Sequence, residues 1–505
     1  MTLLIQGKKE DLRTIYTETS RCRIKQRYVV GFMGFFALAN GYIQRFCLSL
    51  AITEMVATHR LHHTKIDPNA CPLDTVITTN GTIHKSSGEF VWDESTQGLI
   101  LSAFFWGYVV MQLPGGLLAE KYGGKYTLLF GILTSTICTL ATPVIARAGG
   151  AIGLIILRFI LGLGQGPLYP SLNVLMAHWS PPAERGRMGS LIFAGAMIGN
   201  VISMALSGYL IFHGGWTTVF YVFGVLGLCW VTLWYFLITS DPTEHPFISE
   251  KELKYIKDAT GATKNKDELP PTPWRDILTS VPLWGLIIAQ IGHDWGLFTI
   301  ITDLPKYMKS VMHFSITQNG LLSAAPYLVM WIFAIIFGWV VDWMVAKQIS
   351  ITTVRKLFIS VASVGPAIGI LAASYSGCDK VMVASFFTLG MGLMGAFVPS
   401  LKVNALDLSP NYAGTLMALV AGIGAISGII TPYLVGLLTP NSTLLEWRLV
   451  FWIAVLVLCA TNIVYVIMGS AEVQPWNDPS NSLQKKDQEG GKCQSPPEND
   501  KTSHL

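Results

Sequence analysis

Charged residues are scarce in this sequence. Asp, Glu, Lys and Arg make up 13% of its 505 residues, whereas they form about a quarter of a typical soluble domain. Apolar residues make up 51%, and the mean hydropathy is +0.47. Runs of roughly 20 apolar residues recur between Tyr28 and Gly469, each long enough to cross a bilayer as a helix. The scarcity of charge excludes a soluble globular protein and predicts a polytopic protein of the lipid bilayer.

Several motifs are also missing. The eight cysteines form no CxxC pair and have no Cys/His ligand spacing, so neither a zinc site nor a redox site is expected. No glycine-rich loop ends in GK[ST], which leaves ATP-driven transport without support. The net charge of +4 is spread over many loops, so no nucleic-acid partner is expected. No nucleophile–base pair or pair of acids indicates an enzyme, and we predict no resident cofactor.

The apolar runs predict twelve membrane-spanning helices, and a charged, proline-containing segment divides them six and six. The predicted spans are 28–56, 95–118, 126–146, 151–178, 188–212, 216–239, 282–305, 318–342, 353–373, 379–401, 412–437 and 447–469. The expected organisation is a cytoplasmic N-terminal tail (1–27), an N-terminal six-helix bundle (28–239), a cytoplasmic central loop (240–281), a C-terminal six-helix bundle (282–469) and a disordered cytoplasmic tail (470–505).

The distribution of positive charge orients these helices. With the N-terminus inside, the cytoplasmic segments and adjoining helix ends carry 25 of the 35 Lys and Arg residues, the outer ones carry 8, and the other two are Arg45 and Arg158. This asymmetry agrees with the positive-inside rule. Two sequons, at Asn80 and Asn441, then fall outside, where glycosylation occurs. We expect Asn80, in a long polar loop, to be the better acceptor.

Two cysteines, Cys71 and Cys378, lie in loops predicted to face outside. Both a disulfide between them and two free thiols are compatible with the sequence. Four other cysteines lie within apolar spans, where we expect them only to pack: Cys47, Cys138, Cys229 and Cys459.

A short pattern recurs at the same point of each half: a glycine, an acid four residues later, and basic residues after that. Its members are Gly116, Glu120, Lys121, Gly123 and Lys125 in the first half, and Gly338, Asp342, Arg355 and Lys356 in the second. This recurrence after the second and eighth spans indicates two parallel six-helix repeats, the major facilitator arrangement. The glycine would let two helices approach closely, and the acid would pair with a basic residue or a helix N-terminus at a gate. Static topology charge is the alternative.

Arg45 and Arg158 are the two basic residues deep inside apolar spans. An arginine at the centre of a bilayer costs a few kcal/mol on insertion scales, about 3 kcal/mol, so it usually faces a cavity or a partner. Few carboxylates accompany them. The pair therefore suggests a membrane cavity that holds an anion.

Longer motifs in both halves carry a family resemblance. They are Trp106-Gly-Tyr with Gln112-Leu-Pro-Gly-Gly116, Arg158-Phe-Ile-Leu-Gly-Leu-Gly-Gln165-Gly, His178-Trp-Ser-Pro-Pro-Ala-Glu184-Arg-Gly-Arg187, Asn404-Ala-Leu-Asp407-Leu-Ser-Pro410 and Gln474-Pro-Trp476. With them the chain resembles solute carrier family 17, which includes sodium/phosphate cotransporters, sialin and the vesicular glutamate transporters. Within the family it is most similar to insect members described as inorganic phosphate cotransporters.

This resemblance implies an all-α membrane protein of the major facilitator fold and a secondary active transporter of phosphate or small carboxylates. It also implies alternating access between the two halves and Na+ or H+ as the coupling ion. We expect a monomer, and the plasma membrane rather than a vesicular or lysosomal membrane. The alternatives are a proton-coupled, sialin-like transporter of organic anions and a receptor-like member of the fold that transports nothing. Uptake into liposomes separates these functions.

The resemblance also assigns roles to single residues. In the family, arginines at the positions of Arg45 and Arg158 line the central cavity and engage the substrate anion. The planar guanidinium suits this role because it pairs with carboxylate or phosphate through two parallel hydrogen bonds. Tyr42 shares the helix face of Arg45, and Tyr169 follows Arg158 along its own span. A structural ion pair or a side chain directed to the membrane surface is the alternative for both arginines.

Coupling residues are expected in spans four and seven. Gln165 stands where sialin and the glutamate transporters have glutamate, and Asn173 stands where sialin has histidine. Neither amide titrates, so span four lacks the titratable residues that would carry a coupled proton. In span seven, His293 occupies a position where the glutamate transporters have arginine, and Asp294 supplies a carboxylate suited to sodium. An ion pair of Asp294 with either arginine, and a proton on His293, are the alternatives.

Two charges near the end of span ten complete the candidates. We interpret Lys402 and Asp407 as gate or topology charges because both lie near the predicted cytoplasmic end of that span.

Overall fold

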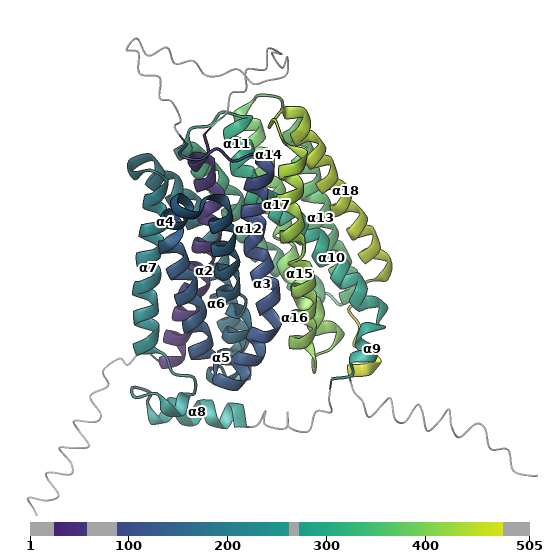
Figure 1. The fold of residues 1–505 in the computed structure, drawn as a ribbon. Helices are drawn as coiled ribbons and strands as arrows, with labels where there is room; N and C mark the ends of the chain where they lie inside the picture. Colours follow the sequence, from purple (N-terminus) through teal and green to yellow (C-terminus); the bar gives the residue numbers. More distant parts are fainter. Residues whose placement is uncertain (1–24, 58–87, 262–271, 478–505) are drawn as a thin grey trace, which may run out of the picture.

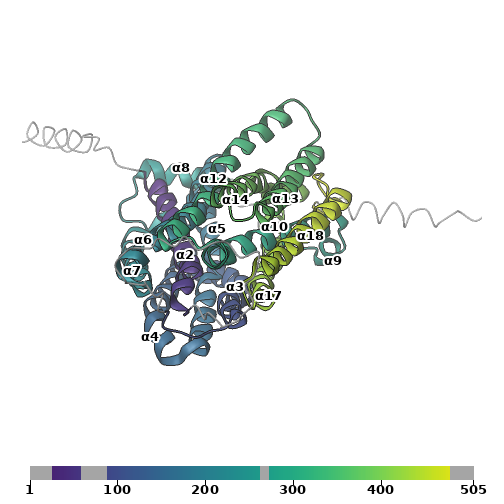
Figure 2. The same cartoon turned by 90° about the horizontal axis from the view of Figure 1, so that it is seen from above.

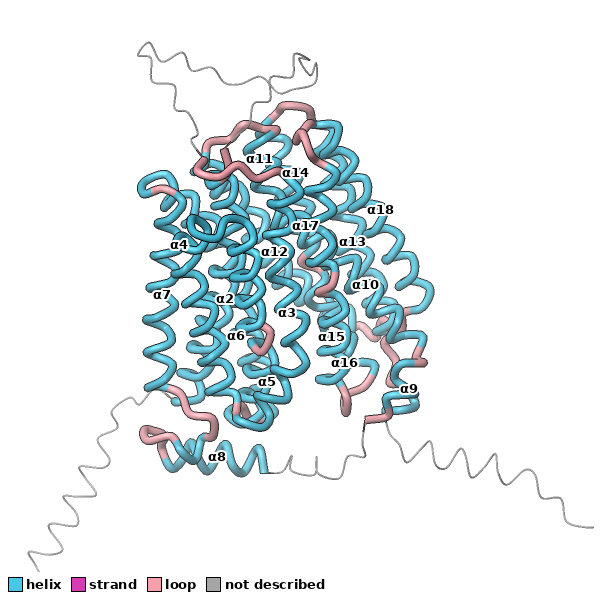
Figure 3. The backbone as a smooth tube through the Cα atoms, viewed as in Figure 1, coloured by secondary structure: helices cyan, strands magenta, loops and turns pink. Residues whose placement is uncertain are grey.

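The computed structural model describes residues 25–57, 88–261 and 272–477. It is a bundle of long helices that stand side by side in two groups (Figures 1 and 2). Apart from one isolated bridge between Val56 and Phe90, the described residues form only helices, turns and loops (Figure 3). The absence of sheet in this part of the chain follows from the bilayer, where a helix satisfies its own backbone hydrogen bonds.

The N-terminal group supplies six spans. Its helices are α2 (Gln26–Met55), α3 (Glu94–Tyr122), α4 (Gly124–Gln165), α5 (Leu168–Trp179), α6 (Pro182–Gly214) and α7 (Trp216–Leu237). Helix α4 runs through two spans because Gly150 breaks it with φ +56° and ψ −146°, a left-handed geometry that favours glycine. Helix α5 continues the second of these spans after a turn at Gly166 and Pro167.

The C-terminal group supplies the other six spans, several of them from two helices each. They are α10 (Val281–Phe298) with the π-turn η3 (Thr299–Asp303) and α11 (Leu304–Ser310), α12 (Ile316–Ala346), α13 (Ile351–Tyr375), α14 (Lys380–Met394) with α15 (Phe397–Leu408), α16 (Ala413–Gly424) with α17 (Ser427–Leu438), and α18 (Leu444–Met468). The breaks lie well inside the spans, where discontinuous helices build the binding sites of many transporters.

By length and composition alone, ten helical stretches of the described residues can cross a membrane. The stretch Gly124–Trp179 counts once although it contains two spans, and the interrupted span 281–310 does not count. These two bring the number to twelve, so the predicted all-α class and number of spans agree with the structure.

Close backbone contacts join the two halves. Helix α3 packs on α17, and α6 packs on α12. A Cβ atom on Gly98 would lie 2.4 Å from the carbonyl oxygen of Pro432, and one on Gly208 would lie 3.0 Å from the Cα of Gly320. Small residues therefore set these two interfaces, as in other membrane helix pairs.

The central loop contains a short helix that packs on the N-terminal half. This helix, α8 (Glu250–Gly261), lies across the end of the bundle below α2 and α5 (Figure 1). Glu252 accepts hydrogen bonds from the backbone N–H groups of Gln26 (3.0 Å) and Arg27 (3.2 Å). These are the first N–H groups of α2, which lack partners within the helix. Two short helices, η1 (Pro242–Glu244) and α9 (Trp274–Leu278), flank α8 in the chain.

The predicted start of the disordered tail is wrong. The chain after Ala471 packs on the C-terminal half as far as Asn477, where η4 (Pro475–Asn477) ends. Trp476 is 8% exposed, and the Asn477 side chain accepts a hydrogen bond from Ser409 Oγ at 2.7 Å. The segment is polar overall, and its contacts depend on one buried tryptophan and one amide. The composition of the segment therefore did not predict these contacts. Residues 478–505 lie outside the described part of the chain.

Candidate functional site

Arg45 lies near the middle of α2 with its guanidinium enclosed by aromatic rings. The side chain is 6% exposed. The guanidinium carbon lies 4.4, 4.7 and 4.8 Å from the ring centroids of Phe104, Phe105 and Tyr108 on α3. Three further rings surround it at 5.0–5.9 Å, those of Phe46, Tyr42 and Phe298. We call these six residues the aromatic cage.

The charge of Arg45 has no acidic partner at ion-pair distance among the described residues. Its Nε is buried without a hydrogen-bond partner. Ring faces attract a cation by roughly 0.5–2 kcal/mol each, but the six rings are neutral and supply no countercharge to the guanidinium. The buried guanidinium therefore lacks a countercharge, which a bound anion would supply.

Arg158 differs from Arg45 in its partners. It is 3% exposed, and its two terminal nitrogens donate to the backbone carbonyls of Gln44 (3.4 Å) and Arg45 (2.8 Å) on α2. Both terminal groups are thus engaged with the backbone. Its Nε, like that of Arg45, is buried without a hydrogen-bond partner. Substrate contact by Arg158 stays a prediction, and the contacts present agree with the structural alternative, although the partner is backbone rather than an acid. Arg158 holds the turn of α2 that carries Arg45.

The polar residues of span four also pack on α2. The hydroxyl groups of Tyr42 and Tyr169 lie 2.8 Å apart, and Gln165 Nε2 donates to the carbonyl of Gly41 at 3.0 Å. The structure therefore brings Tyr42, Tyr169 and Gln165 together at α2, while their roles in substrate binding and coupling stay predictions. Asn173 is exposed and forms none of the described hydrogen bonds.

The C-terminal half contributes a cluster on α10 and α15. The imidazole of His293 stacks on Phe397, with ring centroids 3.3 Å apart and an interplanar angle of 3°, and its Nδ1 is buried without a partner. Asp294 lies against the end of α16, where a Cβ on Gly424 would be 2.4 Å from its Oδ2. Lys402 and Arg45 both act on the Asp294 carboxylate electrostatically.

Lys402, which the sequence analysis interprets as a gate or topology charge, lies beside this cluster in the structure. It is exposed to solvent, yet its ammonium lies 5.4 Å from the Phe397 ring and interacts with buried Asp294. Asp407, in contrast, pairs with Arg355 at 2.7 Å. Five residues turn an α-helix by about 140°, so the two charges face different neighbours. The spacing of five residues in the sequence could have shown that Lys402 and Asp407 lie on different faces of the helix.

One end of the bundle, with residues 88–93 and 311–315, is closed by ion pairs between the halves. We call it the outer end because the predicted orientation places it outside. Lys306 on α11 lies 2.5 Å from Glu94 at the start of α3. Lys309, one turn later, lies 3.0 Å from Glu54 on α2 and donates to the carbonyl of Thr53. The other ion pairs formed by described residues lie within the N-terminal part or within the C-terminal part of the chain. The described ion pairs between halves are thus at the outer end.

In the second half, the glycine and the acid of the recurring gate pattern lack the contacts expected for them. A Cβ on Gly338 would meet nothing within 4 Å, so the predicted close helix approach is wrong there. Asp342 is exposed and forms none of the described ion pairs. Gly338, Asp342 and Arg355 instead line a cavity of about 400 Å³ near the opposite end of the bundle from the closed one.

In the first half the same pattern is also only partly engaged. A Cβ atom added to Gly116 would lie 3.6 Å from the Cβ of Pro170, an ordinary contact distance. Glu120 and Lys121 are exposed. Gly123 ends α3 with φ +86°, and Lys125 lies 5.4 Å from the Tyr235 ring. The gate reading and the topology reading therefore both stay predictions.

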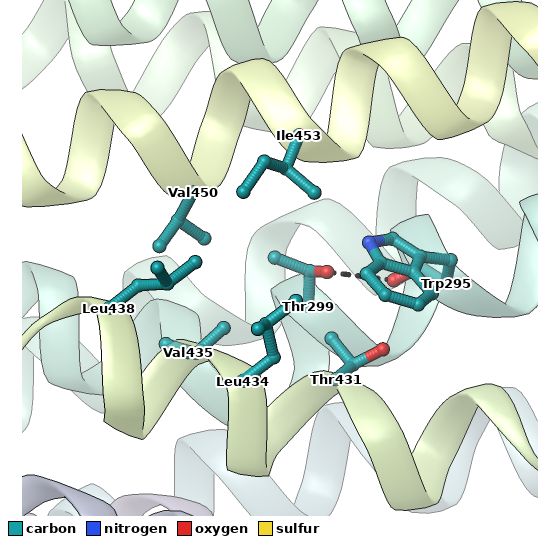
Figure 4. Close-up of a pocket in the computed structure, with 8 residues that line it drawn as sticks. All are labelled: Trp295, Thr299, Thr431, Leu434, Val435, Leu438, Val450 and Ile453. Carbon is teal, nitrogen blue, oxygen red and sulfur yellow. Dashed lines mark hydrogen bonds between the residues drawn. The ribbon is translucent and has the colours of Figure 1, made fainter.

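A small apolar cavity lies between α10, α17 and α18, with Trp295, Thr299 and Thr431 among its lining residues (Figure 4). Its volume of about 10 Å³ is that of a single water. The hydroxyl of Thr299 donates to the carbonyl of Trp295 at 2.8 Å, so it is satisfied already. This cavity is too small for a substrate.

The predicted outer modifications fall partly outside the described residues. Asn80 and Cys71 lie there, whereas Cys378 is disulfide-bonded. The four cysteines predicted only to pack are free, although Cys229 is exposed. Asn441 donates its side-chain amide to Glu446 at 3.0 Å, and its modification stays a prediction.

Comparison with known proteins identifies the family. The model of the Major Facilitator Superfamily matches residues 32–432. The chain belongs to this superfamily. It is 39% identical to a "Putative inorganic phosphate cotransporter" of Drosophila melanogaster, over 96% of this chain and 92% of the relative. It is 36% identical to human "Sialin" (89% and 90%) and 34% identical to human "Vesicular glutamate transporter 2" (92% and 77%).

These relatives place the chain in solute carrier family 17, so the predicted resemblance is confirmed. Solved structures share the fold: a bacterial homologue of the human lysosomal transporter Spinster has a TM-score of 0.66 at 13% identity, covering 88% of this chain and 97% of that one. A D-xylose–proton symporter has a TM-score of 0.64 at 14% identity (88% and 98%). The chain is therefore a membrane transporter and not an enzyme. The plasma-membrane expectation gains no support, since one relative is named as vesicular.

Proposed function

We propose that this transporter carries a small anion, phosphate or a carboxylate, coupled to a cation and driven by alternating access of its two halves. The observation that carries the proposal is the buried Arg45 guanidinium without an acidic partner. An anion in front of it would supply the missing countercharge and, through the planar fork, two hydrogen bonds. The family relatives support the same class of substrate, because their names include phosphate and glutamate.

The charges around the site favour an anion over a cation. Arg45, Arg158, Lys402 and Asp294 sum to two positive charges when His293 is neutral. A bound anion lowers this sum, and attraction in a site of low dielectric is stronger than in water. A cation alone would raise the sum to three positive charges. We therefore expect a coupling cation to bind well only after, or together with, the anion.

Asp294 is the proposed site for the coupling ion, and Na+ is the proposed ion. Its carboxylate supplies a hard oxygen, which sodium prefers over nitrogen or sulfur ligands. Gln165 and Asn173 offer no titratable group in span four. A second candidate is proton coupling at His293, favoured by the unpartnered Nδ1 of its ring.

Closure of the outer end supports alternating access. The pairs Lys306–Glu94 and Lys309–Glu54 join the halves there, while Asp342 at the other end stays unpaired among the described residues. An outward-facing state requires that the outer pairs break.

The test is uptake of labelled phosphate, glutamate, urate and sialic acid by proteoliposomes that contain Arg45 variants. We expect Arg45→Ala and Arg45→Lys to abolish uptake of the transported anion, since lysine keeps the charge but loses the fork. Arg147→Ala is the matched control, because Arg147 is an exposed arginine paired with Glu89. Uptake by Arg45→Ala at the wild-type rate would refute the site, and no uptake of any anion by the wild type would favour a receptor-like role.

A further inference from the structure

A buried acid lies in the break of span seven. Asp303 is the last residue of the π-turn η3, between α10 and α11, and none of its surface is exposed. Helix α11 lies near the outer end of the bundle (Figure 1). The Oδ1 atom of Asp303 has no hydrogen-bond partner. A buried ionised carboxylate with one oxygen that accepts no hydrogen bond has a large desolvation cost. The desolvation cost of a neutral carboxylic acid is much smaller.

The hydrogen bonds of Thr302 indicate which form is present. Its Oγ1 lies 2.6 Å from the carbonyl oxygen of Phe298 and also 2.6 Å from Asp303 Oδ2. A hydroxyl carries one proton, and a carbonyl can only accept. When the hydroxyl donates to Phe298, the second short contact needs a proton on Asp303, which then donates to Thr302. A protonated Asp303 satisfies both contacts at once.

Few charges surround this acid. The elements packed on η3 are α10, α11, α17 and α2. Helix α17 has no Asp, Glu, Lys or Arg, Glu54 on α2 is paired with Lys309, and Asp294 on α10 is nine residues away, about 13 Å along a helix. The charges that act on Asp303 are Lys306, three residues later, and Glu94 of the other half.

Lys306 is therefore the shared partner of two acids. In this structure its ammonium lies on Glu94, 2.5 Å away, and so closes the outer end. An ionised Asp303 on the same turn would compete for that ammonium and would also repel the Glu94 carboxylate. A neutral Asp303 does neither.

We propose that Asp303 is a proton-binding site of the outer gate, and that its protonated form holds the outer end closed. When the O–H bond breaks, the proton passes to water at the outer face and the Lys306 ammonium moves from Glu94 to Asp303. Loss of the Lys306–Glu94 pair then favours opening. The proton enters and leaves on the same side, so this site regulates the gate and adds no proton to the transport cycle. High outer pH favours the open gate, and low outer pH favours the closed one.

The test is a distance measurement that needs no substrate, so it stands apart from the proposed function. Spin labels on non-natural amino acids at Val91 and Val381 spare the native cysteines, and both positions are exposed, at 70% and 75%. Electron–electron resonance on the full-length protein in nanodiscs is recorded between about pH 5 and about pH 9. We expect the closed population of the wild type to fall as pH rises.

Variants assign the effect to Asp303. Asp303→Asn mimics the neutral acid and should stay closed at every pH. Thr302→Val removes the hydroxyl that accepts the proton of Asp303 and so weakens the protonated form. The closed population of this variant should therefore fall at lower pH than that of the wild type. This variant also tests the proposal if Asp303→Asn folds poorly. Glu54→Gln is the control, since it removes the carboxylate of the second pair, Lys309–Glu54, and should keep the pH response. A pH response in Asp303→Asn equal to that of the wild type, or none in the wild type, would overturn the proposal.

Discussion

At the scale of single residues, the neighbours of a buried charge decide its role. The guanidinium of Arg45 faces the aromatic cage and has no acid at ion-pair distance among the described residues. That of Arg158 faces two backbone carbonyls of α2. We propose that the first charge binds the substrate anion, whereas the second contacts the turn of α2 that carries the first.

We therefore predict that Arg158→Met mainly lowers stability. The carbonyls of Gln44 and Arg45 keep their helix hydrogen bonds but lose those from the guanidinium, and a hydrogen bond to a charged group contributes about 1.5–3 kcal/mol. Thermal unfolding of the purified protein in detergent measures the loss, and remaining uptake should show a lower maximal rate. A variant with wild-type stability and only a raised KM would instead assign Arg158 to substrate contact.

Lys402 should strengthen anion binding without contributing to the fold. It is exposed and lies beside the Asp294 carboxylate and the Phe397 ring. Lys402→Met removes one positive charge, so we expect KM for the anion to rise about tenfold, or about 1.4 kcal/mol. Lys347→Met, at an exposed lysine over Trp343, is the control. Equal KM values for both variants would remove Lys402 from the site.

At the scale of elements, broken helices place the site. Helix α16 ends at Gly424, where the Asp294 carboxylate and the Gln290 side chain approach so closely that a Cβ would lie 2.4 and 2.5 Å from them. The π-turn η3 likewise interrupts span seven between Asp294 and the gate lysine Lys306. Two breaks in spans seven and eleven thus surround the proposed coupling residue.

Gly424→Ala should therefore damage coupling more than folding. The added methyl displaces Asp294, and we expect cation-stimulated uptake to fall about tenfold or more. Gly414→Ala on the same helix is the matched control, because a Cβ there meets nothing within 4 Å. Uptake assays with both variants at equal amounts in proteoliposomes make the comparison. Full stimulation in Gly424→Ala would show that Asp294 tolerates displacement or is not the coupling group.

At the scale of the whole molecule, the coupling ion links the site to the movement of the halves. We predict that an inward sodium gradient stimulates anion uptake more than an inward proton gradient, and that Asp294→Asn removes the stimulation. The membrane potential is clamped with potassium and valinomycin, so that voltage does not mimic coupling. Uptake that follows pH, ignores sodium and is lost in His293→Gln would assign the coupling to the proton.

The orientation of the whole chain gives a second prediction at this scale. If the N-terminus is cytoplasmic, Asn80 lies outside and carries a glycan in insect cells. Asn80→Gln should then increase gel mobility by the same amount as glycosidase treatment, and Asn441→Gln should not, because its amide is held by Glu446. Unchanged mobility in both would remove the sequons as evidence for orientation.

The sequence by itself determined the number and order of the spans, since bilayer thickness requires long apolar runs whatever the neighbours are. It also singled out Arg45, because a charge among twenty apolar residues is visible without a structure. It did not separate Arg45 from Arg158, whose difference is the identity of atoms on another helix. Lys402 lay near a span end and was grouped with Asp407, although their side chains turn to different neighbours.

The tertiary structure alone decided which charges meet. Lys306 and Glu94 are separated by 212 positions in the chain and by 2.5 Å in space, and no local pattern encodes that pairing. The same holds for Trp476, which the packing of the C-terminal half buries although its segment is polar. Local composition fixes what enters the membrane, because burial in lipid depends on each helix separately. The contacts between helices depend on their relative placement, and only the folded bundle supplies it.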